Sequence, residues 1–129
     1  AISAERGTLE KRLPTALIIG INKCGTGALR DMLSMHPQIA AAKGEVKYFS
    51  TGEKSQYDEG LEWYRQQMPY SYEDQITLEK SPQYFTDKDA PHRIYKFNPK
   101  TKLILIVREP VTRLISQYSN QKNLRAHIE

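Results

Sequence analysis

Short apolar segments alternate along this chain with stretches that have helical periodicity. Two segments, 16–21 and 102–108, consist mainly of aliphatic and β-branched residues, as expected for strands buried on both faces of a sheet. Two shorter segments, 39–42 and 76–78, predict further strands between them. Several strands separated by longer connections favour a sheet built from strand–helix units.

The connections carry apolar residues at helical spacing. The first predicted helix follows residue 25, with Ala28, Leu29, Met32 and Leu33 recurring at helical intervals until His36-Pro37. Three more helices are expected, from a cap at Asp58 to Met68, from a cap at Asp89 through 91–97, and from Pro110 onward. The alternation predicts an α/β fold with a parallel sheet flanked by helices. Ligands of such sheets bind at the carboxyl ends of the strands.

Length and charge narrow the function classes. The chain has 129 residues, enough for one domain with a modest core, and a formal net charge of +4. Acidic and basic residues are interspersed, which fits an anionic ligand but gives no basic stripe for nucleic acid. Cys24 is the single cysteine, so no intrachain disulfide can form. The three histidines lack metal-ligand spacing, so we expect no metal site.

The segment 15–27 joins the first predicted strand to the first helix through a glycine-spaced loop. A loop at a helix N-terminus presents free N–H groups to an anion, and glycines let the backbone approach that anion closely. Gly20 and Gly25 have the spacing of an ATP-type P-loop, but Thr26-Gly27 follow and the lysine, Lys23, lies inside the spacer. This placement favours a transfer in which a protein cation neutralises the leaving phosphate. The alternative is a strand–helix turn that binds nothing.

Four charged residues follow or end predicted strands: Lys23, Glu45, Lys80 and Arg108. Charged residues are common in loops, and each one alone is best interpreted as a solvated surface group. Together, three cations and one carboxylate at a single edge predict a polyanion site with one base.

Five segments of the sequence form an ordered set of motifs. They are Lys23-Cys-Gly-Thr-Gly-Ala-Leu, Glu45-Val-Lys-Tyr-Phe, Gly60-Leu-Glu-Trp-Tyr, Glu79-Lys-Ser-Pro-Gln-Tyr-Phe and Arg108-Glu-Pro-Val-Thr-Arg-Leu-Ile-Ser116-Gln-Tyr. In this order they resemble the heparan sulfate glucosamine 3-O-sulfotransferases, which are Golgi enzymes dependent on 3′-phosphoadenosine 5′-phosphosulfate (PAPS). The resemblance covers residues 14–120, and its 3-O assignment, as opposed to the related N-sulfotransferases, depends mainly on Gly60-Leu-Glu-Trp-Tyr-Arg and Gln75-Ile-Thr-Leu-Glu-Lys.

The resemblance implies a metal-free, in-line transfer of a sulfuryl group from PAPS to a glucosamine 3-hydroxyl. Glu45 would be the general base, Lys80 would lie between base and sulfate, and Lys23 would stabilise the leaving phosphate. Arg108 and Ser116 would bind the 3′-phosphate. The loop residues implied in binding the 5′-phosphosulfate are Lys23, Cys24, Gly25, Thr26, Gly27 and Ala28.

The resemblance also implies a P-loop-like sulfotransferase fold. Residues 1–13 are expected to form an N-terminal extension, and 14–129 the N-terminal part of a catalytic domain about twice as long. The family implies a heparan sulfate acceptor and, for the full-length protein, a type II membrane enzyme of the Golgi lumen whose anchor lies outside this chain.

Some positions depart from the family pattern and leave other functions open. Asn22, Gly27, Lys47 and Ser50 stand where the family has a basic residue, an arginine, a histidine and an aspartate. These are groups that meet the sugar, so the acceptor could differ, with sulfation at nitrogen or another oxygen. Two further alternatives are a magnesium-dependent nucleotide kinase and a non-catalytic fragment that binds nucleotide or anionic glycan.

Overall fold

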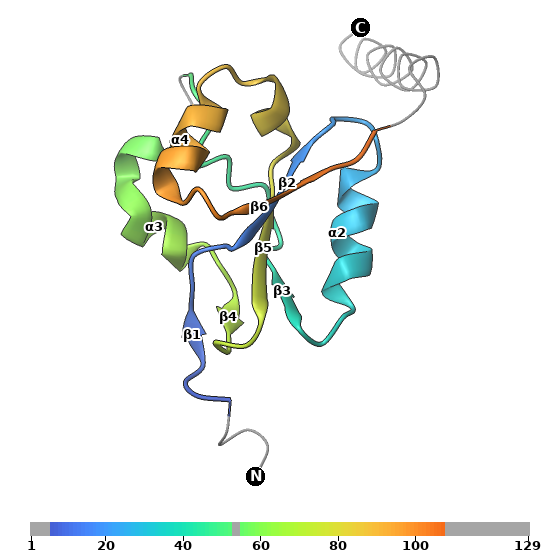
Figure 1. The fold of residues 1–129 in the computed structure, drawn as a ribbon, viewed down its shortest axis with the longest axis vertical. Helices are drawn as coiled ribbons and strands as arrows, with labels where there is room; N and C mark the ends of the chain where they lie inside the picture. The colour runs from blue at the N-terminus through green and yellow to red at the C-terminus, as the bar shows by residue number, and fades with distance from the viewer. Residues whose placement is uncertain (1–5, 53–54, 108–129) are drawn as a thin grey trace, which may run out of the picture.

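The computed structural model describes residues 6–52 and 55–107. Helices and strands alternate along the described chain, as the hydrophobic pattern predicted (Figure 1). The elements are β1 (Glu10–Lys11), β2 (Ala16–Gly20), α2 (Thr26–Ser34), β3 (Ile39–Ala41), the 3-10 helix η1 (Tyr57–Glu59), α3 (Gly60–Gln66), β4 (Tyr70–Ser71), β5 (Ile76–Lys80), the 3-10 helix η2 (Pro82–Thr86), α4 (Ala90–Phe97) and β6 (Lys102–Leu105).

Within residues 6–52 and 55–107, four strands form a parallel sheet in the order β3-β5-β2-β6. Helix α2 lies on one face of this sheet, and α3 and α4 lie on the other (Figure 1). The predicted α/β architecture is therefore confirmed. A separate antiparallel pair, β1 with β4, was not predicted, because two-residue strands leave no periodic signal in the sequence.

The core divides between the two faces of the sheet. Alternation along β2 sends Leu17 into a cluster with aromatic residues of α3 and η2, and sends Ile18 into a cluster with residues of α2. Both side chains are fully buried, so the first strand is buried on both faces as predicted. Trp63 of α3 packs partly buried against the aromatic cluster.

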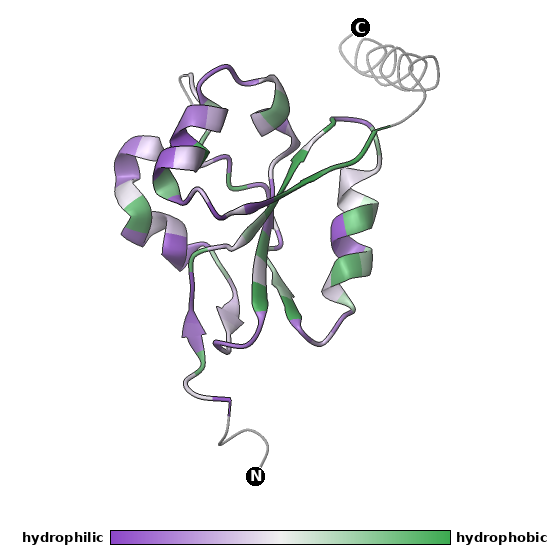
Figure 2. Cartoon of the chain, in the orientation of Figure 1, coloured by the Kyte–Doolittle hydropathy of each residue, from purple (hydrophilic) through white to green (hydrophobic). Residues whose placement is uncertain are grey.

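Strand β6 departs from its prediction. Its residues after Lys102 are apolar (Figure 2), yet the strand ends at Leu105 and leaves Leu103 53% and Leu105 45% exposed. Within the described residues, β6 pairs only with β2 and lies at the edge of the sheet. An apolar segment shows that a strand can be buried, but neighbouring elements decide whether it is. The expected end of this strand, Arg108, lies outside the described residues, as does the helix predicted from Pro110.

Two predicted helix caps also differ. Asp58 lies in η1, and α3 begins after Glu59 without a side-chain cap. Asp89 precedes α4, but the carboxylate that accepts backbone N–H groups there is that of Asp87, from Asp89 at 2.9 Å and Ala90 at 3.1 Å. Within α3, Leu61 is 45% exposed, whereas Tyr64, about one turn further along, is fully buried.

A buried carboxylate lies within the aromatic cluster. Glu79 of β5 is fully buried, and its Oε1 accepts hydrogen bonds from the hydroxyls of Tyr64 and Tyr84, each at 2.7 Å. Its Oε2 accepts a third from Ser81 at 2.7 Å. Burial raises the pKa of Glu79, although these three hydrogen bonds favour the charged form.

In the described part of the chain, none of the helices has the length and apolar character needed to cross a bilayer.

Burial predicts unequal losses of stability for alanine substitutions of two leucines at paired positions, Leu17 on β2 and Leu103 on β6. Leu17→Ala should lower the free energy of unfolding by about 2–5 kcal/mol, since it removes a fully buried side chain. Leu103→Ala should cost less than about 1 kcal/mol, because that side chain is half exposed. Urea unfolding of both variants measures the difference. Equal losses would contradict the exposure of β6.

The raised pKa of Glu79 predicts a pH-dependent stability. Between the ordinary glutamate value of 4.5 and the raised pKa, the folded protein binds a proton that the unfolded chain has lost. The stability of wild type relative to Glu79→Gln should therefore be greatest below the unfolded pKa. It should fall as pH rises through the folded pKa, as measured by urea unfolding from acid to neutral pH.

Glu62→Gln provides the control of opposite sign. Hydrogen bonds, first from Arg65 and then from Gln66, lower the pKa of Glu62 to about 2. The stability that wild type holds over this variant should be present above the unfolded pKa and lost as pH falls toward the folded one. If the two comparisons changed in the same direction with pH, the assignment of the raised pKa to Glu79 would fail.

Candidate active site at the carboxyl ends of the strands

The glycine-spaced loop lies where the sequence placed it, between β2 and the N-terminus of α2. Gly25 is the N-cap residue with φ 86°, a left-handed conformation that favours glycine, and its carbonyl accepts the N–H of Leu29 at 3.0 Å. The first N–H groups of a helix have no acceptor within it. Lys23, on the same loop, is exposed and has φ 65°. The loop therefore offers an anion both N–H groups and a cation.

The side chains of the other loop residues differ in exposure. Cys24 is 2% exposed and is a free thiol, while Thr26 is 6% exposed. Cys24 N–H donates to the carbonyl of Ile21 at 3.1 Å, which closes the turn before the helix. The sulfur thus belongs to the packed base of the loop, and contact with a ligand would come through the backbone.

Glu45 and Lys80 form an ion pair at the carboxyl end of β5. Lys80 Nζ donates to Glu45 Oε1 at 2.8 Å, with the lysine side chain 9% and the glutamate side chain 31% exposed. Lys80 also lies beside the loop, because a Cβ added to Gly27 would be 3.8 Å from its Nζ. The structure therefore brings together three of the predicted elements of the site: the loop, Lys80 and Glu45.

The environment of Glu45 favours its charged form. Partial burial alone would raise the pKa of Glu45, but hydrogen bonds from Lys80 and Gln83 and the charges of Lys80 and Lys47 outweigh it and lower the pKa. The carboxylate is consequently ionised at neutral pH and can accept a proton.

Gln83 is a site residue that the sequence analysis missed. Its Nε2 donates to Glu45 Oε2 at 2.9 Å, so both carboxylate oxygens are held from β5 and η2. The signal that could have found it is its position, three residues past Lys80 and directly after Pro82, which starts the turn at the strand end.

A polar cleft of about 530 Å³ lies beside this pair. It takes residues from the segment after Glu45 and from η2 and its following turn. The residues that line it are Lys47, Ser50, Thr51, Gln83, Thr86, Asp87 and Lys88. Arg108 and Ser116, predicted to bind a phosphate, lie outside the described residues.

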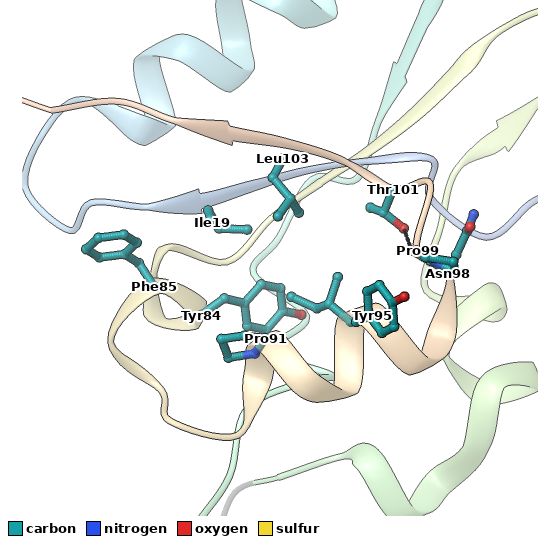
Figure 3. Close-up of a pocket in the computed structure, with 10 residues that line it drawn as sticks. Ile19, Tyr84, Phe85, Pro91, Tyr95, Asn98, Pro99, Thr101 and Leu103 are labelled. Atoms are coloured by element: carbon teal, nitrogen blue, oxygen red, sulfur yellow. Dashed lines mark hydrogen bonds between the residues drawn. The ribbon is translucent and has the colours of Figure 1, made fainter.

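A second hollow, of about 350 Å³, lies between α4, η2 and β6 (Figure 3). Its walls are mainly apolar, and none of the predicted site residues that the structure describes lines it. The ring of Tyr84 forms part of the wall, beside Ile19 and Leu103 (Figure 3). An apolar lining does not suit a phosphate or sulfate group, so the polar edge of the sheet is the candidate site.

Comparisons with known proteins identify relatives of this chain. The chain is 51% identical over 111 residues to human heparan sulfate glucosamine 3-O-sulfotransferase 5, a match that covers 86% of this chain and 32% of that protein. It is 45% identical over 122 residues to human heparan sulfate glucosamine 3-O-sulfotransferase 3B1, covering 95% and 30%. The chain thus spans about a third of the length of these curated relatives.

The fold is shared with a solved sulfotransferase. The crystal structure of a sulfotransferase from Alicyclobacillus acidocaldarius matches with a TM-score of 0.74 and 24% identity, over 92% of this chain and 53% of that one. The sulfotransferase domain matches residues 13–129. These matches confirm what the five motifs predicted: the chain belongs to the sulfotransferase domain family.

Proposed function

We propose that this chain carries the donor loop and the general base of a PAPS-dependent enzyme that sulfates the glucosamine 3-hydroxyl of heparan sulfate. The observation that carries the proposal is the position of Lys80. Its ammonium group is 2.8 Å from the Glu45 carboxylate and also neighbours the loop at Gly27. A cation between a base and an anion-binding loop suits the transfer of a negatively charged group to a hydroxyl.

Donor binding is assigned to the loop. Residues 23–28 would hold the 5′-phosphosulfate through backbone N–H groups at the start of α2 and through Lys23. The resemblance adds Arg108 and Ser116 for the 3′-phosphate. PAPS, when bound, supplies a sulfuryl group on a phosphate leaving group. The backbone at Gly25 leaves room for such a donor, since a Cβ built there would have no neighbouring atom within 4 Å outside its adjacent residues.

The transfer step uses the groups around Lys80. Glu45 takes the proton of the acceptor hydroxyl as its oxygen bonds to sulfur, and the bond from sulfur to the bridging phosphate oxygen breaks. The electron pair of that bond stays on the phosphate, where Lys23 stabilises it. Lys80 and Gln83 hold the two oxygens of Glu45, so the base is oriented before the acceptor binds. The proposal needs no metal, because Lys23 and Lys80 supply the positive charge.

The acceptor is assigned to the polar cleft beside Glu45. Lys47 and Lys88 offer two ammonium groups for an anionic glycan. The names of the relatives specify heparan sulfate glucosamine and the 3-hydroxyl. We further propose the Golgi lumen as the site of action, which rests on the family resemblance.

Removing the base should separate catalysis from donor binding. Glu45→Gln keeps the shape and one hydrogen-bond acceptor but cannot take the proton, so sulfuryl transfer should fall about 10²–10⁴-fold. Binding of the product 3′-phosphoadenosine 5′-phosphate should stay close to wild type. Transfer is measured with radiolabelled donor in the complete protein that contains this sequence, with Glu59→Gln, an exposed position, as the control. Undiminished transfer by Glu45→Gln would exclude this glutamate as the base.

Removing the loop cation should weaken the donor site. Lys23→Ala should raise the Kd for 3′-phosphoadenosine 5′-phosphate about tenfold to a hundredfold, because a charge-assisted hydrogen bond contributes about 1.5–3 kcal/mol. Lys100 is an exposed lysine before β6, at the amino-terminal ends of the strands, so Lys100→Ala should bind the ligand like wild type. Calorimetric titration without magnesium tests this. Binding of ADP with magnesium, but not of the metal-free ligand, would instead support a kinase.

A further inference from the structure

The segment from Glu45 to Phe49 is neither helix nor strand, yet its backbone is fixed at two alternate amides. Lys47 N–H donates to Ser81 Oγ at 3.0 Å, and Phe49 N–H donates to the Tyr84 hydroxyl at 3.4 Å. These two hydroxyls are the ones that donate to the buried carboxylate of Glu79, one to each oxygen. A single buried carboxylate thus connects to both amides.

The direction of these hydrogen bonds is set by the donors available. In its charged form the Glu79 carboxylate can only accept, and Ser81 and Tyr84 then each donate their one hydroxyl proton to it. Their oxygen lone pairs then remain free to accept the N–H groups of Lys47 and Phe49. Both chains run from amide to hydroxyl to carboxylate, an arrangement in which each hydrogen bond polarises the next.

The conformation of Lys47 shows why the segment needs such support. Lys47 has φ 58°, a left-handed conformation that residues other than glycine rarely adopt unless their surroundings hold them there. Its own N–H is the group that Ser81 accepts. The turn that it makes lies two residues after Glu45 and so sets where that carboxylate reaches.

We propose that Glu79 is a positioning residue: through Ser81 and Tyr84 it holds the segment 45–49 so that Glu45 meets Lys80. This inference rests on the proposed role of Glu45 as the base. Adjacent residues of β5 point to opposite faces of the sheet: Lys80 contacts the Glu45 carboxylate and neighbours the loop at Gly27, whereas Glu79 contacts the hydroxyls of Tyr64 and Tyr84. A buried carboxylate costs desolvation that an apolar residue would avoid, which is consistent with a role in positioning.

Two matched pairs of variants test the proposal. Ser81→Ala removes the hydroxyl that Lys47 uses, whereas Ser71→Ala removes an equally buried hydroxyl that contacts Thr77. Tyr84→Phe removes the hydroxyl that Phe49 uses. Its control is Tyr64→Phe, which removes a hydroxyl that donates to the same Glu79 oxygen, Oε1, but accepts no amide of the segment 45–49.

The readouts are amide hydrogen exchange at Lys47 and Phe49 and the pKa of Glu45, followed by carboxyl ¹³C NMR. Ser81→Ala should speed exchange at Lys47, and Tyr84→Phe at Phe49, by about two- to tenfold more than their controls. Ser81→Ala should also raise the lowered pKa of Glu45 toward its ordinary value, as the contact with Lys80 loosens. In the complete protein, kcat should fall with the KM for donor unchanged.

The proposal is overturned if each variant and its control change exchange equally, which indicates a loss of general stability alone. An unchanged pKa of Glu45 in folded Ser81→Ala would also overturn it. If Ser81→Ala does not fold, Tyr84→Phe, which keeps the ring, decides through exchange at Phe49. These readouts report the position of Glu45 whether or not it acts as the base. The positioning role of Glu79 can therefore be disproved while the base role of Glu45, tested by transfer in Glu45→Gln, still holds, and the reverse is also possible.

Discussion

Burial of one carboxylate organises the aromatic half of this protein. Glu79 lies with no exposed surface on a central strand, and a charge in that position is tolerated only when donors surround it. The three donors come from α3, from η2 and from the end of β5, so satisfying the carboxylate fixes how these elements meet. Stacking of Tyr48 on Tyr64 at 4.4 Å between ring centroids then ties the segment after Glu45 to the same cluster.

The alternation of a β-strand carries this constraint to the candidate active site. Glu79 and Lys80 are neighbours in sequence, but one points to the aromatic core and the other to the side of α2 and its loop. The aromatic core and the candidate active site therefore meet at two adjacent residues of β5, Glu79 and Lys80. A change in the packing around Glu79 reaches the Glu45–Lys80 pair through the strand end and through the backbone of the segment 45–49.

Strand β2, which is buried on both faces, supports the loop that precedes α2. Because β2 is buried on both faces, its carboxyl end is a rigid support for the loop that follows. Gly25 supplies the left-handed conformation with which α2 begins. Anion-binding N–H groups and Lys23 are thus presented from a fixed position, while the exposed lysine side chain keeps its freedom to meet a ligand.

The sequence by itself determined the strand–helix alternation, the loop at the start of α2 and, through five motifs, the family. These features follow from local periodicity, glycine positions and residue identity, which are properties of short segments. It also predicted that Glu45 and Lys80 share one edge, because parallel strands place their carboxyl ends together. Only the tertiary structure decided the exposure of β6, the pairing of β1 with β4, the role of Asp87 at α4, and the contacts of Gln83 and Glu79. Each of these depends on what packs against a residue from a distant part of the chain, and burial and hydrogen-bond partners of that kind leave no periodic trace in the sequence.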